Sequence, residues 1–362
     1  MKFGLMIDTH VDKWKLIQHA EELGFHRAWI PDSQMIWADC YVTMGLAAVN
    51  TKRILIGTGM TTPGTRIAPV TAHSIGSINQ LAPGRVFLGI ATGHTSMRLI
   101  GQPPISPSEL REYVGVLRKL LDGEAVDYTY RGRTAEIQFM HRDRYYVNLD
   151  NRIPIYIAAN GPKALAATGE LGDGWMLAGR TEKETTEGIA QIRSAAAKIG
   201  RTLPADFLAA CSSSACVLRR GEKLTDDRVV NQTGSMVTTN LHLNYEVWEL
   251  SGRKDELILP HFANIWDDYV KRVANYSLPP ESRFRQIHDG HATFLQEGER
   301  RFVTPEAIKA SCLVGEPDEI VEQVRGLERA GLTEISLLPP ADYQSDVLRD
   351  FAELVMPHFK ED

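Results

Sequence analysis

The residues best suited to chemistry stand where short apolar runs end. The stretch GTGMTTPGTR, residues 57–66, directly follows the apolar run at 54–56. Glycine packs no side chain and weakens a strand, so it often marks a position that something approaches closely. Glycine, alanine and threonine together would form a flat wall with backbone donors, which suits a planar ring system. Ordinary loops of a barrel have the same composition, so both interpretations stay open.

A second stretch, AANGPKALAATG, carries a more specific signal. Asn160 and Gly161 precede Pro162, a residue that often begins a helix. Free N–H groups and the helix dipole at such a start favour an anion, and Lys163 could add a positive charge. The stretch therefore predicts a phosphate site, although a helix start without a ligand would look the same.

Metal and nucleophile chemistry have weaker support. The chain contains neither HExxH nor GxSxG. His288 and His291 are three residues apart in HDGH, but no acidic partner is evident in the flanking sequence. The serines at 212–214 have no paired base in sequence and are interpreted as pocket lining or a strand end. We predict no metal site.

Composition narrows the class of protein. The chain has 362 residues, 43 % hydrophobic and 24 % charged, with a net charge of −6. It has no Lys/Arg cluster suited to a phosphate backbone, which argues against nucleic acid. The N-terminus turns polar after seven residues, so it predicts neither a signal peptide nor a membrane span. The four cysteines form no CxxC pair and are expected to be reduced. We expect a cytoplasmic protein with no membrane partner.

Apolar runs alternate with helical patterns along most of the chain. The predicted strands are 2–7, 27–32, 54–59, 85–93, 153–160, 174–179, 206–218 and 334–339. Eight such strands, most of them apolar on both faces, favour a parallel (β/α)8 TIM barrel. A doubly wound open sheet is the alternative, but it would need a GxGxxG turn after the first strand, and this turn has none.

Helix and hairpin signals support the same architecture. Ser106 and Glu109 form a predicted capping box, and Thr181 begins another helix in the same way. Ser345 is expected to cap the last helix. Residues 125–139 form two short runs around Arg-Gly, which predicts a hairpin inserted into the barrel pattern.

In such barrels, ligands bind where strands end and loops begin. The predicted strand ends are Asp8–His10, Asp32–Trp37, Gly57–Thr62, Ala91–Ser96, Ala158–Gly161 and Gly179-Arg180. His10 and Ser33 are therefore candidate substrate contacts.

The alternation is lost between residues 219 and 305. This segment follows the seventh strand, so it leaves the barrel at the ligand-binding end. Long segments of this kind are often functional lids, and bulky residues such as Trp248 and Trp266 argue against disorder. We expect one barrel domain, residues 1–362, with a mostly helical insertion at 219–305 that acts as a substrate lid. Trp248 and Trp266 are its candidate substrate contacts.

Four stretches carry a resemblance to a known family. They are AEELGFHRAWIPD, IGTGMTTPGTRIAPVTAHSIGSINQLAPGRVFLGIATG, YIAANGPKALAATGELGDGWMLAG and LVGEPDEIVEQVRGLERAGL. They resemble the luciferase-like superfamily of flavin- and deazaflavin-dependent oxidoreductases, nearest the methylenetetrahydromethanopterin reductase branch. The resemblance covers two ranges, 1–215 and 305–360. It implies a TIM barrel with insertions.

The resemblance also implies a cofactor site. A bulge after the third strand, with a cis peptide between Gly59 and Met60, would back the ring, and Gly57 and Gly59 would make room for it. The cofactor phosphate would lie at the helix start described above. The residues expected to bind the cofactor are Gly59, Met60, Thr61, Gly93, Ala159, Asn160, Gly161 and Pro162.

Two positions are candidate catalytic residues on the same grounds. Trp37 matches an aromatic residue of deazaflavin-dependent sugar dehydrogenases, and His94 stands where those enzymes have a glutamate. Histidine can act as a general acid or base near neutral pH, although a solvent-facing histidine would fit equally well. Ser33 stands where many members have a histidine, so the sugar-dehydrogenase mechanism is not carried over whole.

The family offers two kinds of chemistry. We expect a monooxygenase that uses molecular oxygen and reduced FMN from a separate flavin reductase on a small organic substrate, because FMN is the commoner cofactor. The alternative is an F420-dependent reductase or dehydrogenase that transfers a hydride, which the branch resemblance and Trp37 favour. A catalytically silent flavin-binding protein is a third hypothesis. Because family members are usually dimers or larger, we also expect a homo-oligomer.

Overall fold

The computed structural model describes residues 1–177 and 181–359, which form two compact units. The first unit comprises Met1–Ser212 and Leu327–Ser336, and the second comprises Ser213–Gly326 and the C-terminal residues from Leu337. Gly179 and Arg180, expected at the end of the sixth barrel strand, lie outside the described residues.

Eight parallel strands close into a barrel, as predicted. In ring order they are β1 (Lys2–Met6), β2 (Arg27–Ile30), β3 (Leu55–Thr58), β4 (Val86–Ile90), β7 (Ile155–Ala158), β8 (Gly174–Leu177), β9 (Leu208–Val217) and β11 (Glu334–Leu337). Every residue of β2, β4 and β8 is buried, and apart from Arg27 at the start of β2 these strands appear in the sequence as continuous apolar runs.

The amino-terminal end of the barrel interior is filled by a buried ion pair. Arg27 and Glu334, the first residues of β2 and β11, are paired, and Trp29 Nε1 donates to Glu334 at 2.9 Å. The Arg27 guanidinium also lies 5.2 Å from the ring centroids of both Phe87 and Tyr156. Because these side chains fill this end, a ligand would bind at the opposite end of the barrel, where the strands run into their longer loops.

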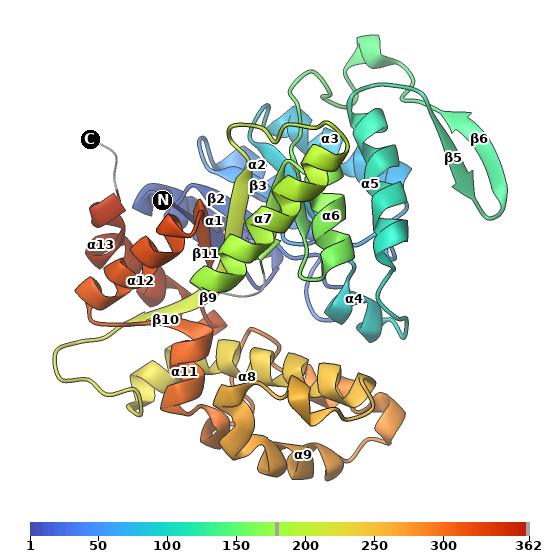
Figure 1. Cartoon of the computed structure of the whole chain (residues 1–362). Helices are drawn as coiled ribbons and strands as arrows, with labels where there is room; N and C mark the ends of the chain where they lie inside the picture. The colour runs from blue at the N-terminus through green and yellow to red at the C-terminus, as the bar shows by residue number, and fades with distance from the viewer. Residues whose placement is uncertain (178–180, 360–362) are drawn as a thin grey trace. The chain divides into compact units, whose positions relative to one another are not determined.

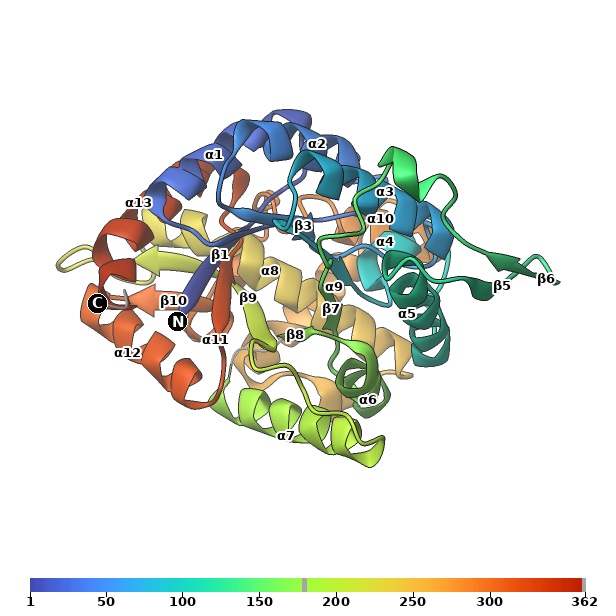
Figure 2. The ribbon, with the colours of Figure 1, turned by 90° about the horizontal axis from the view of Figure 1, so that it is seen from above.

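Helices surround this barrel, as Figure 2 shows for α1, α2, α3, α5, α6 and α7. Their bounds are α1 (Trp14–Leu23), α2 (Cys40–Asn50), α3 (Ala68–Leu81), α4 (His94–Leu99), α5 (Pro107–Leu121), α6 (Pro162–Leu171) and α7 (Glu182–Lys198). Short 3-10 helices are η1 (Val11–Lys13) and η2 (Arg142–Arg144).

Two of the three predicted helix caps are confirmed. Ser106 and Thr181 each accept from the N–H three residues on, in complete capping boxes at the starts of α5 and α7. The prediction for Ser345 is wrong. The 3-10 turn η7 (Ala341–Tyr343) leads directly into α13 (Gln344–Leu354), so Ser345 lies inside the helix.

The predicted hairpin is confirmed. Strands β5 (Val126–Tyr130) and β6 (Arg133–Ile137) pair antiparallel in a separate sheet, and Figure 1 shows them extending away from α5. The sheet is joined to the barrel body at its base, where Gln138 Nε2 donates to the Gly123 carbonyl at 2.9 Å.

The second unit contains the insertion after β9, which is mostly helical, as predicted. Its elements up to the next strand are α8 (Asp227–Leu250), η3 (Asp255–Leu257), η4 (Pro260–Ile265), α9 (Trp266–Ala274), η5 (Pro280–Ser282), α10 (Phe284–Ile287), η6 (Arg300–Phe302) and α11 (Pro305–Ser311). An additional strand that the sequence pattern did not predict, β10 (Cys312–Gly315), pairs in parallel with Ser214–Val217 of β9. The chain continues through α12 (Pro317–Arg329) and ends with η8 (Met356–Phe359). None of the helices in the described ranges is long and apolar enough to cross a membrane.

Candidate functional site

The chain bulges where β3 ends. The peptide bond between Gly59 and Met60 is cis, as the resemblance implied. Pairing with β4 resumes at Thr61, whose N–H donates to the Gly89 carbonyl at 3.0 Å and whose carbonyl accepts from Ala91 N–H at 3.0 Å. These two hydrogen bonds fix the backbone immediately after Met60.

The barrel's own side chains fill the space beside the two glycines of this strand end. A Cβ atom at Gly57 would overlap the Phe87 ring and the Phe87 carbonyl oxygen. A Cβ atom at Gly59 would lie 2.7 Å from the Trp29 Cβ atom. Strand packing therefore occupies the side of each glycine on which a side chain would stand. That these glycines make room for a ring stays a prediction for their backbone. Gly59 stays a candidate ligand contact through its backbone.

A carboxyl group not among the predicted site residues holds the bulge from the side. Asp32, just after β2, is buried, and its Oδ2 accepts from the Thr61 hydroxyl at 2.6 Å. Its Oδ1 accepts from Gln34 Nε2 at 2.6 Å, and Arg66 Nε lies 3.4 Å from Oδ2. Asp32 thus ties the loop after β2 to the loop after β3.

Arg66 extends this network to the start of α2. Its guanidinium donates to Asp39 at 2.6 Å and lies 4.7 Å from the centre of the Tyr41 ring. Partial burial alone would lower the pKa of the Arg66 guanidinium, but the charges of Asp32 and Asp39 raise it, so the side chain stays cationic. Burial, reinforced by the Asp32 charge, holds the pKa of the Cys40 thiol well above its usual range, which makes this thiol a poor nucleophile.

The loops after β1 and β2, which carry three predicted site residues, are joined to each other. Ala38 N–H donates to the Thr9 carbonyl at 2.9 Å. His10 is exposed, and its Nδ1 accepts from a backbone N–H at the start of η1. Ser33 and Trp37 are half-buried, and Trp37 N–H donates to the Ser33 carbonyl at 3.2 Å. The structure therefore brings these three residues into two adjoining loops.

The loop after β4 meets the loop after β3. Gly93 adopts φ +80° as the residue before α4, and a Cβ there would lie 2.9 Å from the Thr62 Cβ. His94 begins α4 and is half-buried. The Thr62 hydroxyl is buried without a hydrogen-bond partner among the described residues, so a polar donor or acceptor is available beside Gly93.

The start of α6 is open, in agreement with the predicted anion site. Asn160, Gly161 and Pro162 are exposed, and within the described ranges no side chain caps the helix. A Cβ at Gly161 would meet no described atom within 4 Å. Ala159 is buried, and Trp175 Nε1 donates to its carbonyl at 2.7 Å, which fixes the strand end before the helix. These features fit the phosphate group of a cofactor.

The two tryptophans expected to contact substrate lie in the second unit. Trp248 and Trp266 are both buried and meet edge to face, with ring centroids 5.5 Å apart. Trp248 Nε1 also donates to Asp255 at 3.1 Å. Both side chains contribute to the insertion's own core.

The histidines of HDGH have an acidic neighbour that is distant in sequence. His288 Nε2 lies 3.1 Å from Glu246 Oε1, and the Nδ1 atoms of His288 and His291 are 3.4 Å apart. Glu246 comes from α8, 42 residues earlier, which is why the flanking sequence does not reveal it. Within 1–177 and 181–359, no three His, Cys, Asp or Glu residues gather as a possible metal site.

Comparison with known families is decisive for the class of protein. Residues 9–334 match the family described as luciferase-like monooxygenase. The chain belongs to this family. It is accordingly an enzyme, an oxidoreductase of the flavin- or deazaflavin-dependent kind.

Individual relatives point to one branch. The chain is 26 % identical over 343 residues to the 5,10-methylenetetrahydromethanopterin reductase of Archaeoglobus fulgidus, covering 92 % of each protein. It is 34 % identical over 189 residues to the enzyme of the same name from Methanolobus tindarius, and this match spans 50 % of the chain and 54 % of the relative. The solved F420-dependent tetrahydromethanopterin reductase of Methanopyrus kandleri has the same fold, with a TM-score of 0.72 at 21 % identity and 99 % of each chain covered.

The expectation of an FMN-dependent monooxygenase is wrong. Another relative, 33 % identical over 177 residues, is the F420-dependent hydroxymycolic acid dehydrogenase of Mycobacterium tuberculosis, with 45 % of this chain and 48 % of the relative covered. These relatives bear the names of reductases and dehydrogenases, which agrees with the alternative hypothesis. The separate flavin reductase was expected only as the source of reduced FMN.

Proposed function

We propose that this enzyme uses coenzyme F420 to transfer a hydride to or from a small organic substrate. The observation that carries the proposal is the similarity to methylenetetrahydromethanopterin reductase along 92 % of the chain. The F420-dependent name of the dehydrogenase relative supports the same cofactor. When bound, F420 supplies a two-electron hydride carrier that does not activate oxygen usefully.

The residues of the first unit fit such a cofactor. Gly59, Met60 and Thr61 would lie against the ring. The backbone hydrogen bonds between Thr61 and β4, and the hydrogen bond from the Thr61 hydroxyl to Asp32, would hold this bulge in place. The exposed start of α6 at Asn160–Pro162 would hold the phosphate through backbone N–H groups, with Ala159 positioned by Trp175. Because Gly93 has no side chain, it would let the loop after β4 approach the loop after β3 closely.

Two side chains are proposed to act on the substrate. An imidazole nitrogen of His94 would take up or release the proton that accompanies hydride transfer. The half-buried indole of Trp37 would pack against the reacting group and exclude water from it. His10 and Ser33, in the two joined loops, would add polar contacts to the substrate.

We assign substrate selection to the insertion, residues 219–305. It leaves the barrel at the carboxyl end of β9, the end of a barrel strand at which ligands bind. The buried Trp248 and Trp266 would give this part a fixed core.

The proposed phosphate site can be tested with matched glycine variants. Gly161→Asp would place a carboxylate at the open helix start, where it would repel a phosphate and occupy its donors. Gly115→Asp is the control, because Gly115 lies in α5 and its added Cβ would also meet no described atom within 4 Å. We expect the F420 dissociation constant to rise at least about tenfold, or ~1.4 kcal/mol, in Gly161→Asp and to stay unchanged in Gly115→Asp.

The cofactor itself is tested by fluorescence titration of the purified protein with F420 and FMN separately. We expect saturable binding of F420, followed by bleaching of its absorbance when a suitable reduced substrate is added. Binding of FMN alone, with no binding of F420, would refute the proposal.

A further inference from the structure

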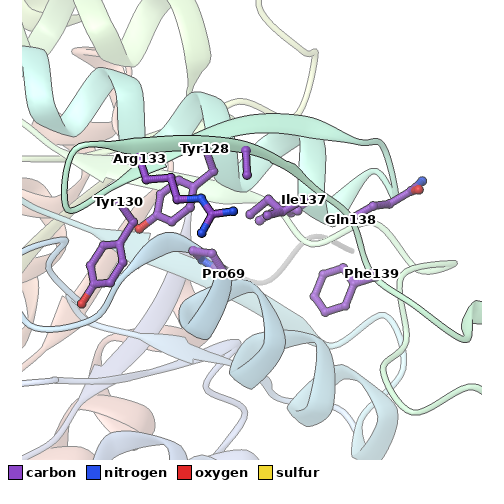
Figure 3. A pocket seen from close by; sticks show the side chains of 9 residues that line it. Pro69, Tyr128, Tyr130, Arg133, Ile137, Gln138 and Phe139 are labelled. Carbon is purple, nitrogen blue, oxygen red and sulfur yellow. The ribbon is translucent and has the colours of Figure 1, made fainter.

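The hairpin of β5 and β6 encloses a cavity that contains none of the residues proposed to bind F420 or the substrate. Its volume is 410 Å³, and pockets for small molecules commonly measure about 300–1,000 Å³. As Figure 3 shows, side chains of the hairpin turn toward Pro69 at the start of α3. The residues that line this cavity, here called the hairpin groove, lie between Pro69 and Phe139 and belong to the first unit.

Strand pairing decides which residues of the hairpin face the groove. Tyr128 is opposite Ala135 and Tyr130 is opposite Arg133, so these four side chains lie on one face of the two-stranded sheet. All four line the groove. The two acidic residues of the strands are opposite each other in the alternate register, so they face outward. The inner face is therefore mainly aromatic and apolar and carries no carboxylate.

Both walls of the groove are held by hydrogen bonds. On the helix side, the Tyr113 hydroxyl of α5 lies 2.6 Å from the Thr71 hydroxyl of α3 and donates to the Arg66 carbonyl at 2.8 Å. On the hairpin side, Gln138 lines the groove, and its Nε2 donates to the Gly123 carbonyl at 2.9 Å. Walls that are fixed before a ligand arrives lower the entropic cost of binding it.

The chemistry of the lining indicates the class of ligand. Among the described residues that line the groove, Arg133 is the only charged one, and it has no ion-pair partner within 1–177 or 181–359. A guanidinium donates a planar fork of hydrogen bonds to a carboxylate and repels cations. The rings of Tyr128 and Tyr130 lie within 10° of parallel, with centroids 6.3 Å apart, and so present flat faces to a planar ring.

We propose that the hairpin groove binds a small aromatic carboxylate. The ring of this ligand packs on the faces of Tyr128 and Tyr130, and its carboxylate pairs with the Arg133 guanidinium at the exposed edge, where Tyr130 is 44 % exposed. An aliphatic acid would leave the tyrosine faces without a stacking partner. A nucleic acid would need a row of cations along its phosphates, and the lining supplies one. Binding in the groove is independent of which cofactor the barrel takes.

Isothermal titration calorimetry of the full chain tests the ligand class with 2-naphthoate and its neutral counterpart 2-naphthamide. We expect 2-naphthoate to bind at one site per chain with a dissociation constant below about 1 mM, and 2-naphthamide to bind at least about tenfold more weakly. Arg133→Gln should raise the constant for 2-naphthoate at least about tenfold and leave that for 2-naphthamide unchanged. Arg144→Gln is the control, because this arginine is exposed and does not line the groove.

Variants on the two faces of the hairpin test the location. Ala135→Asp places a carboxylate inside the groove and should raise the dissociation constant for 2-naphthoate at least about tenfold. Thr134→Asp, one residue away on the outer face, is the matched control and should leave it unchanged. Gly161→Asp should also leave it unchanged, which separates the groove from the proposed phosphate site. Circular dichroism of each variant separates loss of binding from loss of folding.

Four results would each overturn the proposal. The first is a failure of 2-naphthoate to saturate the wild type below about 1 mM, and the second is equal affinity for 2-naphthamide. The third is wild-type affinity for 2-naphthoate in folded Arg133→Gln or Ala135→Asp protein. The fourth is tighter binding of octanoate than of 2-naphthoate, which would assign the groove to an acyl chain. Weaker 2-naphthoate binding in Gly161→Asp would likewise refute it, by placing the ligand at the start of α6.

Discussion

Replacing Thr61 with valine tests whether Asp32 positions the bulge. Thr61 is fully buried and Asp32 is 2 % exposed, and the hydroxyl donates to the carboxyl oxygen at 2.6 Å. Valine has nearly the same shape, so Thr61→Val removes this hydrogen bond but leaves both backbone hydrogen bonds to β4. Asp32 would keep Gln34 and the more distant Arg66 as partners.

The size of the effect follows from the partners. Hydrogen bonds to charged groups contribute about 1.5–3 kcal/mol, and neutral ones about 0.5–1.5 kcal/mol. We therefore expect Thr61→Val to lower the free energy of unfolding by ~1.5–3 kcal/mol. Because the bulge is proposed to back the cofactor ring, we also expect the F420 dissociation constant to rise about tenfold, or ~1.4 kcal/mol.

Thr185→Val is the control for this experiment. Thr185 is also fully buried, but its hydroxyl donates to the Thr181 carbonyl at 2.9 Å within α7, away from the strand ends. Urea denaturation gives the free energy of unfolding, and fluorescence titration gives the affinity for F420. If both variants lose stability and both keep full affinity for F420, the contact between Thr61 and Asp32 has a structural role only, and the positioning argument fails.

Three further predictions concern single residues of the first unit. Gly59→Ala should lower the free energy of unfolding in urea by ~1–3 kcal/mol through overpacking, whereas Gly161→Ala, in open space, should change it little. Burial alone would raise the pKa of the Asp173 carboxyl, but Arg118 at 2.5 Å and a backbone N–H lower it below the unfolded value of about 3.9. The stability that Asp173 contributes is therefore present above about pH 4 and is lost as the pH falls through the lower pKa of the folded state. In a plot of unfolding free energy against pH, Asp173→Asn should therefore make the acid side less steep. His94→Gln should reduce kcat by about 10²–10⁴ while F420 affinity in the same titration stays unchanged, if His94 carries the proton.

The strands could be predicted because burial on both faces leaves a continuous apolar run. All eight barrel strands lie within the predicted ranges, and β2 is buried along its whole length. The capping box at Ser106 is equally local, since its two hydrogen bonds join residues three apart. β10 was not predicted, although its four residues are also buried, because it pairs with the far end of β9 outside the barrel ring and so falls outside the alternation of strands and helices.

Helices α2 and α3 show the opposite case. A helix is recognised by an apolar stripe alternating with a polar face. Helices α2 and α3 have no charged residues on any face, so their sequences do not show the apolar–polar alternation with a period of 3.6 residues. The feature that obscures them in the sequence is the one that leaves an apolar surface in the structure.

The candidate site was predictable only in part, for a similar reason. The Gly59-Met60 bulge and the start of α6 each lie in one short stretch, and both could be located from the sequence. The hydrogen bond between Asp32 and Thr61 joins residues that are 29 positions apart in the sequence. The Arg66 guanidinium contacts the same Asp32 carboxyl group from a third place in the chain. Only the fold brings these three side chains together.

The division into two units separates the proposed tasks of the enzyme. All residues proposed to bind F420 belong to the first unit, and the bulge among them is held by hydrogen bonds whose donors and acceptors lie in that unit. Trp248 and Trp266 belong to the second unit, where they contact each other. A change to the core of the insertion should therefore alter the Michaelis constant for the organic substrate and leave the F420 dissociation constant unchanged. Changes at Thr61 should alter the F420 constant, so one set of variants can assign each task to its unit.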